Sequence, residues 1–418
     1  MYAVRLRSVK HAGGRQRWPG SRGVHAGVVR ILFTFTGGSG HFLPALPIAR
    51  AAAARGHEVL FSGQEAMLGA VRAAGFPFLP SGGATLADPT ARRPLVPVDR
   101  AHEEQVIRDT FAGRTARDRT SRLLDVAARW RPEVIVLDEV DFGAAVAAER
   151  LGLPHAAIVV LAAGGLLRPD LIADSLDLLR AEHGLPADPG LEMLHRHLTL
   201  VPVPPSYRNP DDPLPATAHH IQPPVLDPRC AAGQDDESTT GVLAWLAERP
   251  GRPTAYITLG TVFHQESGDL FPRVVTAVAG LDANVVVTVG REIDPGELGP
   301  QPPNVRITSF APQGALLPHC DVVVCHAGSG SVIGALALGV PLVLLPLGAD
   351  QPLNADRCDA LGVARVLDPV SADHDDLGRA VLDVLEDLRF RTAAERIRDE
   401  TASLPTAEHA VALIEALT

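Results

Sequence analysis

The chain has few cysteines, no long apolar run and no excess of positive charge. Four cysteines in 418 residues do not make a disulfide framework, so we expect reduced thiols in a cytoplasmic protein. No segment reaches the ~18 apolar residues of a membrane span. The most apolar segments, such as 340–347, have the length of a strand, and we expect no stable membrane insertion. The net charge of −11 argues against nucleic-acid binding, which leaves a basic face on a protein.

The sequence also starts without the apolar core of a secretion signal. Residues 1–28 carry six cationic side chains and no acidic one, and we interpret them as a flexible basic extension. The remaining length is enough for two or three domains. Hydrophobic residues make up 46% of the chain, which is typical of a globular protein.

Strand and helix patterns alternate after this extension. A β-rich run at 28–35 is followed by a glycine loop at 37–41, an alanine-rich helix that ends near Gly56, and a strand at 57–62. This order predicts a βαβ unit with a parallel sheet. The alternation continues with helices at 64–75, 101–130 and 143–150 and with strands at 134–137 and 156–161.

A proline-rich stretch separates this lobe from a second one with the same pattern. Prolines recur between residues 202 and 228, which indicates an interdomain connection. The strands of the second lobe are expected at 255–259, 285–289, 305–308, 321–325 and 341–345. A final helix at 402–417 is expected to pack on the first lobe.

The sequence thus predicts an α/β fold of two facing Rossmann-like domains, with parallel sheets and a cleft between them. The expected boundaries are 1–28 for the extension, 29–215 for the first domain, 216–238 for the linker, 239–400 for the second domain and 401–418 for the C-terminal helix.

The strongest local signal lies at residues 322–331, where the apolar run VVVC leads into the loop HAGSGS and then into a helix. Small side chains let backbone N–H groups approach an anion, and a helix N-terminus adds about half a positive charge. Ser329 and Ser331 can donate hydroxyl groups, and His326 can donate a ring N–H to a phosphate oxygen. The pattern indicates a phosphate site without a metal; a structural turn with a satisfied histidine is the alternative.

Residues 310–355 read FAPQGALLPHCDVVVCHAGSGSVIGALALGVPLVLLPLGADQPLNA and resemble the donor-binding signature of glycosyltransferase family 1, the inverting enzymes with the GT-B fold. The segment HFLP at 41–44, residues 131–154 and TLGT at 258–261 also resemble this family. The resemblance covers nearly all of residues 29–400 and is greatest to bacterial members that decorate antibiotics. It implies an acceptor-binding first domain and a second domain that binds a nucleotide-diphosphate sugar.

The resemblance also implies roles for single residues. Phe310 would stack on or flank the base, with Ala311 beside it, and Gln313 would lie near the base or ribose. Asp350 and Gln351 would bond sugar hydroxyls. The diphosphate would be held by His326, Gly328, Ser329, Gly330 and Ser331, with Thr261 at the phosphate or at the acceptor-side entrance.

Two positions depart from the family pattern. Ala327 replaces a common glycine, a change that we expect to matter little. Gly334 stands where many members carry a glutamate that binds the ribose hydroxyls. A carboxylate bonded to a 2′-OH would be left unpaired by a deoxyribose, at a cost of about 1–3 kcal/mol. The glycine therefore predicts a dTDP-sugar donor, and a UDP-sugar is the alternative.

An acceptor hydroxyl needs a base within hydrogen-bond reach. The resemblance implies that His41 takes the proton and that Asp138 orients its ring, as a carboxylate does in catalytic triads. A structural histidine at a turn is the alternative for His41. Glu139 and Asp141 are alternatives for the role of Asp138, but we interpret them as parts of a solvated loop. No metal and no cofactor are expected, because the nucleotide sugar is a substrate.

The acceptor is expected to be a small hydrophobic natural product. First-lobe loops near residues 80–110 and 162–200 would shape its pocket, with Gly40, Phe111 and Leu166 as contacts. Apolar residues in these segments could equally belong to the core. A homodimer and an auxiliary partner are both left open.

Three other functions fit part of the pattern. A nicotinamide enzyme could use the glycines at 38 and 40, but the third glycine of GxGxxG is absent at Leu43 and no acidic residue ends the next strand. A non-catalytic partner of another transferase is disfavoured, because His41, Asp138 and the phosphate loop are all present. A sugar-nucleotide epimerase of the same fold is disfavoured by the same base and by the Asp-Gln pair.

Overall fold

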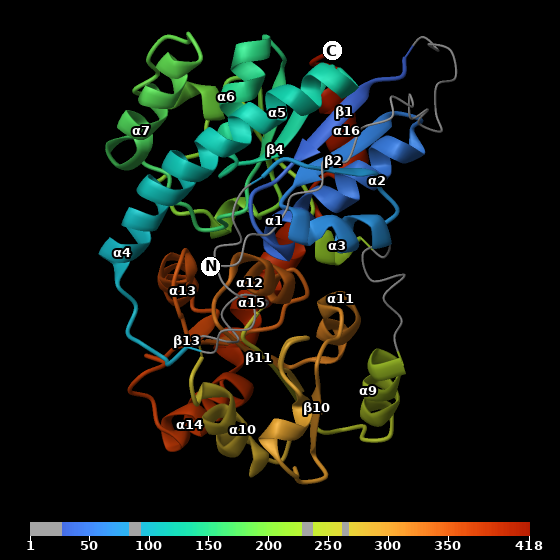
Figure 1. Cartoon of the computed structure of the whole chain (residues 1–418). Coiled ribbons are helices and arrows are strands. Elements are labelled where there is room, and N and C mark those ends of the chain that lie inside the picture. The colour runs from blue at the N-terminus through green and yellow to red at the C-terminus, as the bar shows by residue number, and fades with distance from the viewer. Residues whose placement is uncertain (1–26, 83–92, 228–236, 261–266) are drawn as a thin grey trace, which may run out of the picture.

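Two α/β lobes lie one above the other in the computed structural model, which describes residues 27–82, 93–227, 237–260 and 267–418 (Figure 1). Each lobe is built on one sheet, and the paired strands of both sheets are parallel. The expectation of two Rossmann-like domains with parallel sheets is confirmed.

Sheet A of the first lobe has the strand order β3-β2-β1-β4-β5-β6-β7. Its strands are β1 (Arg30–Thr34), β2 (Glu58–Gly63), β3 (Phe78–Pro80), β4 (Val134–Asp138), β5 (His155–Ile158), β6 (Leu198–Val201) and β7 (Ala218–His220). Its helices are α1 (Ser39–Phe42), α2 (Leu46–Ala54), α3 (Leu68–Ala73), α4 (Arg100–Gln105), α5 (Ala116–Trp130), α6 (Phe142–Leu151) and α7 (Pro169–Glu182). A π-helical segment, Val106–Thr115, joins α4 to α5.

Sheet B of the second lobe has the strand order β10-β9-β8-β11-β12-β13. Its strands are β8 (Thr254–Thr258), β9 (Asn284–Thr288), β10 (Val305–Thr308), β11 (Val322–Cys325), β12 (Leu342–Leu344) and β13 (Ala364–Val366). The helices that follow the first lobe are α9 (Glu237–Ala247), α10 (Leu270–Ala279), α11 (Gln313–Leu316), α12 (Ser329–Leu336), α13 (Gln351–Ala360), α14 (His374–Glu386), α15 (Leu388–Ala402) and α16 (Ala407–Glu415).

Both strand orders reverse beside the first strand of the lobe. In sheet A the chain moves outward from β1 to β3 and then places β4 on the other side of β1. In sheet B, β8 and β11 have the same relation. Open α/β sheets bind ligands at the carboxyl ends of the strands next to such a reversal. His41 follows β1, Asp138 ends β4 and His326 follows β11, so all three lie at these two positions.

One apolar cluster joins the two lobes. It contains Val159 and Tyr207 of the first lobe together with Val323 and Val332 of the second. Leu353 on α13 packs against this cluster and also against the first-lobe cluster beneath α6. Since burial of apolar surface gives about 25 cal/mol per Å², this shared cluster stabilises the contact between the lobes.

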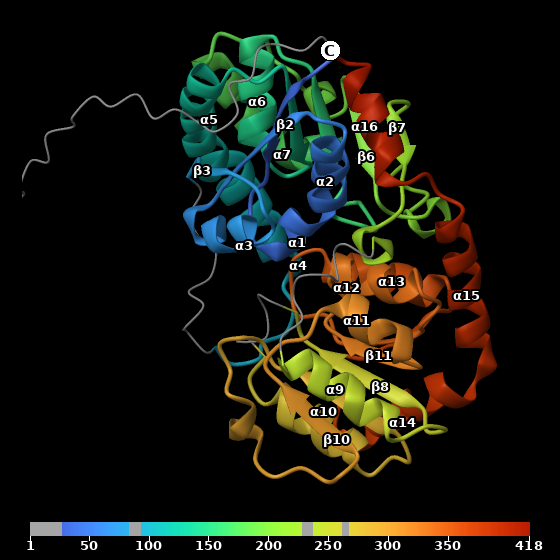
Figure 2. The ribbon, with the colours of Figure 1, turned by 90° about the vertical axis from the view of Figure 1, so that its right-hand side faces the viewer.

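The end of the chain returns to the first lobe. Helix α15 runs along one side of the molecule, and α16 lies beside α2 on sheet A (Figure 2). Ile414 of α16 is fully buried in the same apolar cluster as Ile48 of α2. Glu415 then pairs with Arg55 and with the buried ring of His57, which joins the C-terminal helix to the start of β2.

The structure differs from the sequence expectations in four short strands, β3, β6, β7 and β13. They have only three or four residues, too few to show the alternation that identifies a strand. Strand β7 lies inside the predicted linker 216–238, so sheet A extends further along the chain than residue 215.

A helix also replaces part of a predicted loop. Residues 162–200 were expected to form loops around the acceptor, but they contain α7, which begins with Pro169 at a position where proline is tolerated. Helix α7 packs on the π-helical segment Val106–Thr115. The expected helical region 101–130 is present, with this π-helical turn in its middle.

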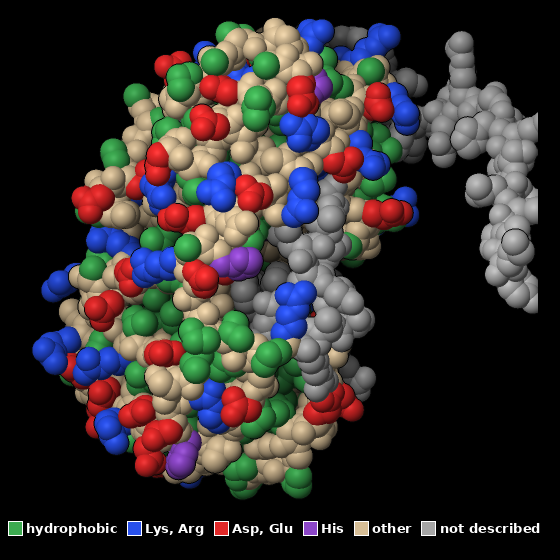
Figure 3. All heavy atoms as spheres, turned by 60° about the vertical axis from the view of Figure 1, so that its left-hand side comes forward, with side chains coloured by type: hydrophobic (Ala, Val, Ile, Leu, Met, Phe, Trp, Pro, Cys, Tyr) green, Lys and Arg blue, Asp and Glu red, His purple; other side chains and the backbone are tan. Residues whose placement is uncertain are grey.

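The outer surface mixes charges of both signs. Figure 3 shows Lys and Arg side chains interspersed with Asp and Glu over the face that it presents, without a broad basic area on that face. Within the described ranges, the helices are all too short or too polar to cross a membrane.

Candidate active site

His41 and Asp138 meet at the carboxyl edge of sheet A. His41 lies on α1, directly after β1, and Asp138 is the last residue of the neighbouring strand β4. The Nδ1 atom of His41 is 3.3 Å from Oδ2 of Asp138, which makes an ion pair, although its N–H does not point straight at that oxygen. Asp138 is held in turn by backbone N–H groups, with Thr36 N 2.6 Å from Oδ2 and Val140 N 2.8 Å from Oδ1.

The environment of His41 suits a general base. Burial lowers the pKa of His41, but the charge of Asp138, with smaller effects from Asp350 and Glu139, raises it above its ordinary value overall. The side chain is 25% exposed, so the ring can meet a ligand. Its Nε2 has no hydrogen-bond partner in the described part of the chain. Asp350 belongs to the second lobe and accepts from Ser329, which accepts in turn from Ala162 N of the first lobe, so the two edges lie next to each other.

Glycine backbone makes room for two histidine rings. A Cβ atom on Gly37 would lie 2.5 Å from Cδ2 of His41. In the second lobe, a Cβ on Gly260 or on Gly328 would lie 2.5 Å from Nε2 of His326. Real Cβ atoms do not approach this closely, so a larger residue at any of the three positions would displace a ring. Sequence reasoning assigned no role to Gly37 or Gly260.

The phosphate loop has the expected form. Strand β11 leads through His326 and Ala327 to Gly328, the N-cap of α12, and the first turn of this helix includes the exposed Gly330. Ala327 has a φ of 65°, in the left-handed region that costs an L-residue about 1–2 kcal/mol. The family's glycine would relieve this strain, so the expectation that the replacement matters little is wrong for the backbone energy. Thr261 lies outside the described residues.

The hydroxyl group of Ser329 already forms hydrogen bonds within the protein. Its Oγ donates to Oδ2 of Asp350 at 2.7 Å and accepts from Ala162 N of the first lobe at 2.8 Å. An anion at this helix start would therefore meet the backbone N–H groups first, with the Ser329 hydroxyl already engaged. Gly330 adds a second position without a side chain, and a Cβ there would meet nothing within 4 Å.

Other side chains that we expected to contact the donor already form hydrogen bonds within the protein or are buried. Gln313 donates through Nε2 to Oγ of Ser331 at 3.0 Å, which joins the predicted base and phosphate contacts. The Oε1 atom of Gln351 accepts from Leu347 N at 2.7 Å, so only its Nε2 is left for a sugar. The side chain of Ala311 is buried in the core and leaves only its backbone for a ligand.

Arg291 is a residue that sequence reasoning missed. Its guanidinium carbon lies 3.9 Å from the centre of the Phe310 ring, a cation–π contact at the carboxyl edge of sheet B. Phe310, the expected base contact, therefore has a cationic group over its ring. Arg291 is near the end of β9, 19 residues before Phe310, and no motif in the sequence connects the two.

The expected acceptor contacts divide into two kinds. Gly40 is exposed on α1 next to His41. Phe111 on the π-helical segment and Leu166 before α7 are buried in the first-lobe core, where they present little surface to a ligand. Their contact with an acceptor stays a prediction. Leu43, two residues after His41, is a large apolar side chain that is exposed.

Glu139 and Asp141 are not in a solvated loop, and that interpretation is wrong. Asp141 is fully enclosed with Arg119, whose Nε lies 2.7 Å from its Oδ1, and it also caps α6. Glu139 is buried, and its Oε1 accepts from the N–H groups of Val160 and Leu161. Burial raises the pKa of Glu139 to about 7.

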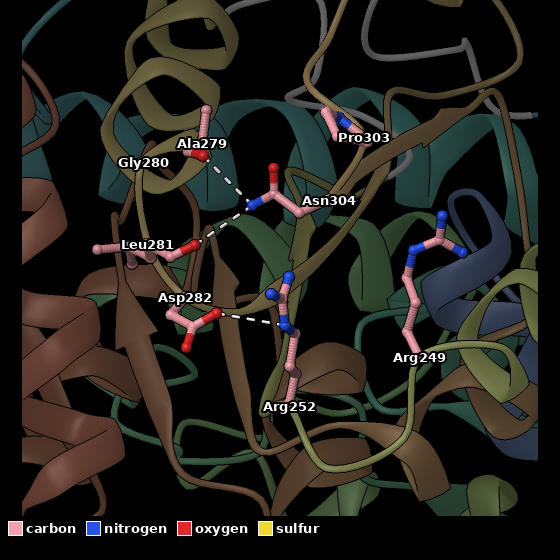
Figure 4. Close-up of a pocket in the computed structure, with 8 residues that line it drawn as sticks. All are labelled: Arg249, Arg252, Ala279, Gly280, Leu281, Asp282, Pro303 and Asn304. Carbon is pink, nitrogen blue, oxygen red and sulfur yellow. Dashed lines mark hydrogen bonds and ion pairs between the residues drawn. The ribbon is translucent and has the colours of Figure 1, made fainter.

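A separate hollow on the second lobe is not part of this arrangement. It is lined by Arg249, Arg252, Asp282 and Asn304 among others, in loops before β8, β9 and β10 (Figure 4). These loops are at the amino ends of the strands, opposite the phosphate loop. Among the described residues, no group of three metal-ligating side chains could hold a metal ion.

The geometry agrees with the proteins that this chain resembles. A family model described as "Erythromycin biosynthesis protein CIII-like, C-terminal domain" matches residues 272–417. The 4'-demethylrebeccamycin synthase of Lentzea aerocolonigenes is 31% identical over 430 residues, which cover 93% of this chain and 99% of the relative. The chain belongs to the bacterial natural-product glycosyltransferases.

Two further relatives agree with this assignment. The 10-deoxymethynolide desosaminyltransferase of Streptomyces venezuelae is 27% identical, with 93% of this chain and 97% of the relative covered. A solved structure of the spinosyn rhamnosyltransferase SpnG complexed with thymidine diphosphate is 26% identical, with a TM-score of 0.76 over 92% of this chain and 100% of that one. The expected GT-B fold and the expected glycosyltransferase activity are confirmed.

Replacing Gly37 by alanine in this glycosyltransferase is predicted to lower turnover by about 10²-fold, because the new Cβ would displace the His41 ring. Two glycine variants serve as controls. Gly38→Ala adds a Cβ that meets nothing within 4 Å, and Gly56→Ala shares the positive φ without a contact. Steady-state kinetics should show turnover near wild type for both. Equal losses in all three variants would contradict a specific effect on His41.

Replacing Glu139 by glutamine tests its buried acid. In the folded protein the pKa of Glu139 is raised to about 7, whereas in the unfolded chain it has the ordinary value of 4.5. Between these two pH values the folded protein keeps a proton that the unfolded chain releases. The free energy of unfolding of the wild type should therefore fall as the pH rises across this interval. The glutamine keeps an acceptor for Val160 and Leu161 but cannot ionise. Thermal melts at about pH 5 and pH 8 should show a smaller decrease for the variant; equal decreases would contradict the assignment.

Proposed function

We propose that this glycosyltransferase moves a deoxysugar from a dTDP-sugar to a hydroxyl group of a small hydrophobic natural product, with inversion at the anomeric carbon. The observation that carries the proposal is the meeting of two edges. The His41–Asp138 pair lies at the carboxyl edge of sheet A. The phosphate loop and Asp350 lie at the carboxyl edge of sheet B. A base and a diphosphate site on opposite walls of one cleft are what transfer to a hydroxyl needs.

The proposed reaction is a single displacement. Nε2 of His41 takes the acceptor proton as the acceptor oxygen forms a bond to the anomeric carbon, while Asp138 stabilises the imidazolium through Nδ1. The bond from the anomeric carbon to the diphosphate oxygen breaks on the opposite face, so an α-linked donor gives a β-glycoside. The N-terminus of α12 and His326 stabilise the negative charge of the departing diphosphate. No cofactor takes part in this scheme.

The donor proposal is supported by Gly334 on α12. A Cβ at this position would lie 3.6 Å from Oε1 of Gln313, so a carboxylate there would reach the predicted ribose region. This chain has no such carboxylate for a 2′-OH, and the spinosyn rhamnosyltransferase relative binds thymidine diphosphate. The acceptor proposal is supported by the relatives that act on 10-deoxymethynolide and form a rebeccamycin.

The His41→Ala variant is predicted to lower kcat by about 10²–10⁴-fold, because the acceptor hydroxyl loses its base. Products from dTDP- and UDP-sugars with several aglycones would be followed by mass spectrometry, and the NMR coupling constant of the anomeric proton would report inversion. His374→Ala, at an exposed side chain on α14, is the matched control and should keep wild-type turnover. Unchanged kcat in a pure His41→Ala protein would refute the role of His41.

The donor proposal predicts that dTDP binds more tightly than UDP in a competitive titration. The Gly334→Glu variant should shift the preference toward UDP, because the new carboxylate gains a partner only when a 2′-OH is present. A hydrogen bond to a charged group corresponds to roughly a tenfold change in the ratio of the two dissociation constants. Tighter binding of UDP by the wild type would overturn the dTDP assignment and leave the transferase proposal standing.

A further inference from the structure

Asn354 lies at the centre of a hydrogen-bond network beneath the donor site. It is on α13, one turn after Asp350, and its side chain is completely buried. The Nδ2 atom lies 2.9 Å from the carbonyl oxygen of Ala327, 3.1 Å from Oγ of Ser329 and 2.8 Å from Oδ2 of Asp350. Its two N–H groups therefore serve three oxygens. The resemblance to the family assigned it no role.

The three acceptors belong to the parts that would hold the donor. Ala327 is the strained residue of the phosphate loop, and its carbonyl is kept in place by this amide. Asp350 is the predicted sugar contact, and its Oδ2 is occupied by Asn354 and Ser329. Fixing one carboxylate oxygen in this way determines where the other oxygen, Oδ1, points.

The fourth bond of Asn354 reaches the other lobe. Its Oδ1 accepts from Ala163 N at 3.1 Å, next to the bond from Ala162 N to Oγ of Ser329. The Tyr207 hydroxyl, also from the first lobe, donates to the backbone carbonyl of Asn354 at 3.3 Å. One buried side chain thus touches the phosphate loop, the sugar contact and the loop after β5.

We propose that Asn354 is a positioning residue that orients Asp350 toward the donor sugar and ties this orientation to the contact between the lobes. The inference rests on the proposed function, because it takes Asp350 as the sugar contact. An asparagine suits this place because one end of its amide donates and the other accepts. An aspartate of the same shape keeps the acceptor for Ala163 but replaces the donor group with an oxygen beside Asp350.

The Asn354→Asp variant provides the test, with dTDP and dTDP-glucose as probes in calorimetric titrations at about pH 8. The measured quantity is the dissociation constant of dTDP-glucose divided by that of dTDP, which isolates the contribution of the sugar. Repulsion between two adjacent carboxylates should turn Asp350 away and raise this ratio roughly tenfold over wild type. An unchanged ratio would overturn the inference.

Lowering the pH should rescue the variant. Two carboxyl groups that face each other at hydrogen-bond distance share a proton, and one apparent pKa of the pair rises. The protonated group can then donate to its neighbour as the amide did. At about pH 5.5, where the two carboxyl groups share a proton, the ratio of dissociation constants measured for Asn354→Asp should therefore move back toward the wild-type ratio. A defect that does not change with pH would indicate a merely structural role and would overturn the inference.

Asn304→Asp is the matched control. The side chain of Asn304 also donates through one amide to three oxygens, the carbonyls of Ala279, Leu281 and Ala283, at the opposite edge of sheet B. Figure 4 shows the bonds to Ala279 and Leu281. This variant should melt at a lower temperature and keep the wild-type ratio. A similar rise of the ratio in both variants would overturn the inference, because destabilisation of the lobe would then be enough.

Two outcomes separate this inference from the proposed function. A wild-type protein that binds neither probe would refute the nucleotide-sugar proposal and the inference with it. If the wild type binds both probes and the variant has the same ratio of dissociation constants as the wild type, the inference is refuted and the proposed function is not. Should Asn354→Asp not fold, Asn354→Ser takes its place. A serine hydroxyl can donate to only one of the three oxygens, so the ratio should rise at both pH values, and an unchanged ratio would overturn the inference.

Discussion

The uniform direction of the strands in each sheet is the constraint on which the site depends. Because the strands run parallel, all of their carboxyl ends lie on one edge, and the reversal of strand order beside β1 and β8 opens a crevice there. Each lobe brings polar groups to this edge: a histidine paired with a carboxylate in the first, and a helix N-terminus near a histidine in the second. The proposed transfer needs both sets of groups.

The lobes are joined by groups that belong to the site itself. Ser329 and Asn354 accept backbone N–H groups from the first lobe while they hold Asp350 in the second. A bound donor would therefore lie beside the contact that sets the spacing of the two walls. An apolar cluster continues this contact into the interior, with Leu353 packed on both sides. In the proposed reaction, binding of the donor and the relative position of the lobes would therefore be linked through these hydrogen bonds.

Three acidic residues within four positions show how far local sequence can mislead. Asp138, Glu139 and Asp141 follow one strand, but their carboxylates meet an imidazole, two backbone N–H groups and a guanidinium, respectively. Burial raises the pKa of Glu139, which has no formal ion pair among the residues described, whereas Asp141 has Arg119 beside it. The segment 138–141 therefore contains a carboxylate that pairs with a histidine, a loop anchor and a structural ion pair. Their sequence neighbours are too similar to separate these roles.

The sequence by itself determined the two-lobed α/β fold and the glycine loop at 322–331, because these follow from local periodicity and from a motif that adjoins a strand. The pairing of His41 with Asp138 was implied by the family resemblance and not by periodicity. Short edge strands such as β7 were missed, since three residues are too few to show a period. Helix α7 has 14 residues and was missed for another reason, because its segment was interpreted as a loop around the acceptor. Only the tertiary structure decided that Arg291 covers Phe310, that Gly37 and Gly260 leave space for histidine rings, and that Asn354 joins the lobes. These contacts connect residues far apart in the chain, and packing rather than local pattern selects them.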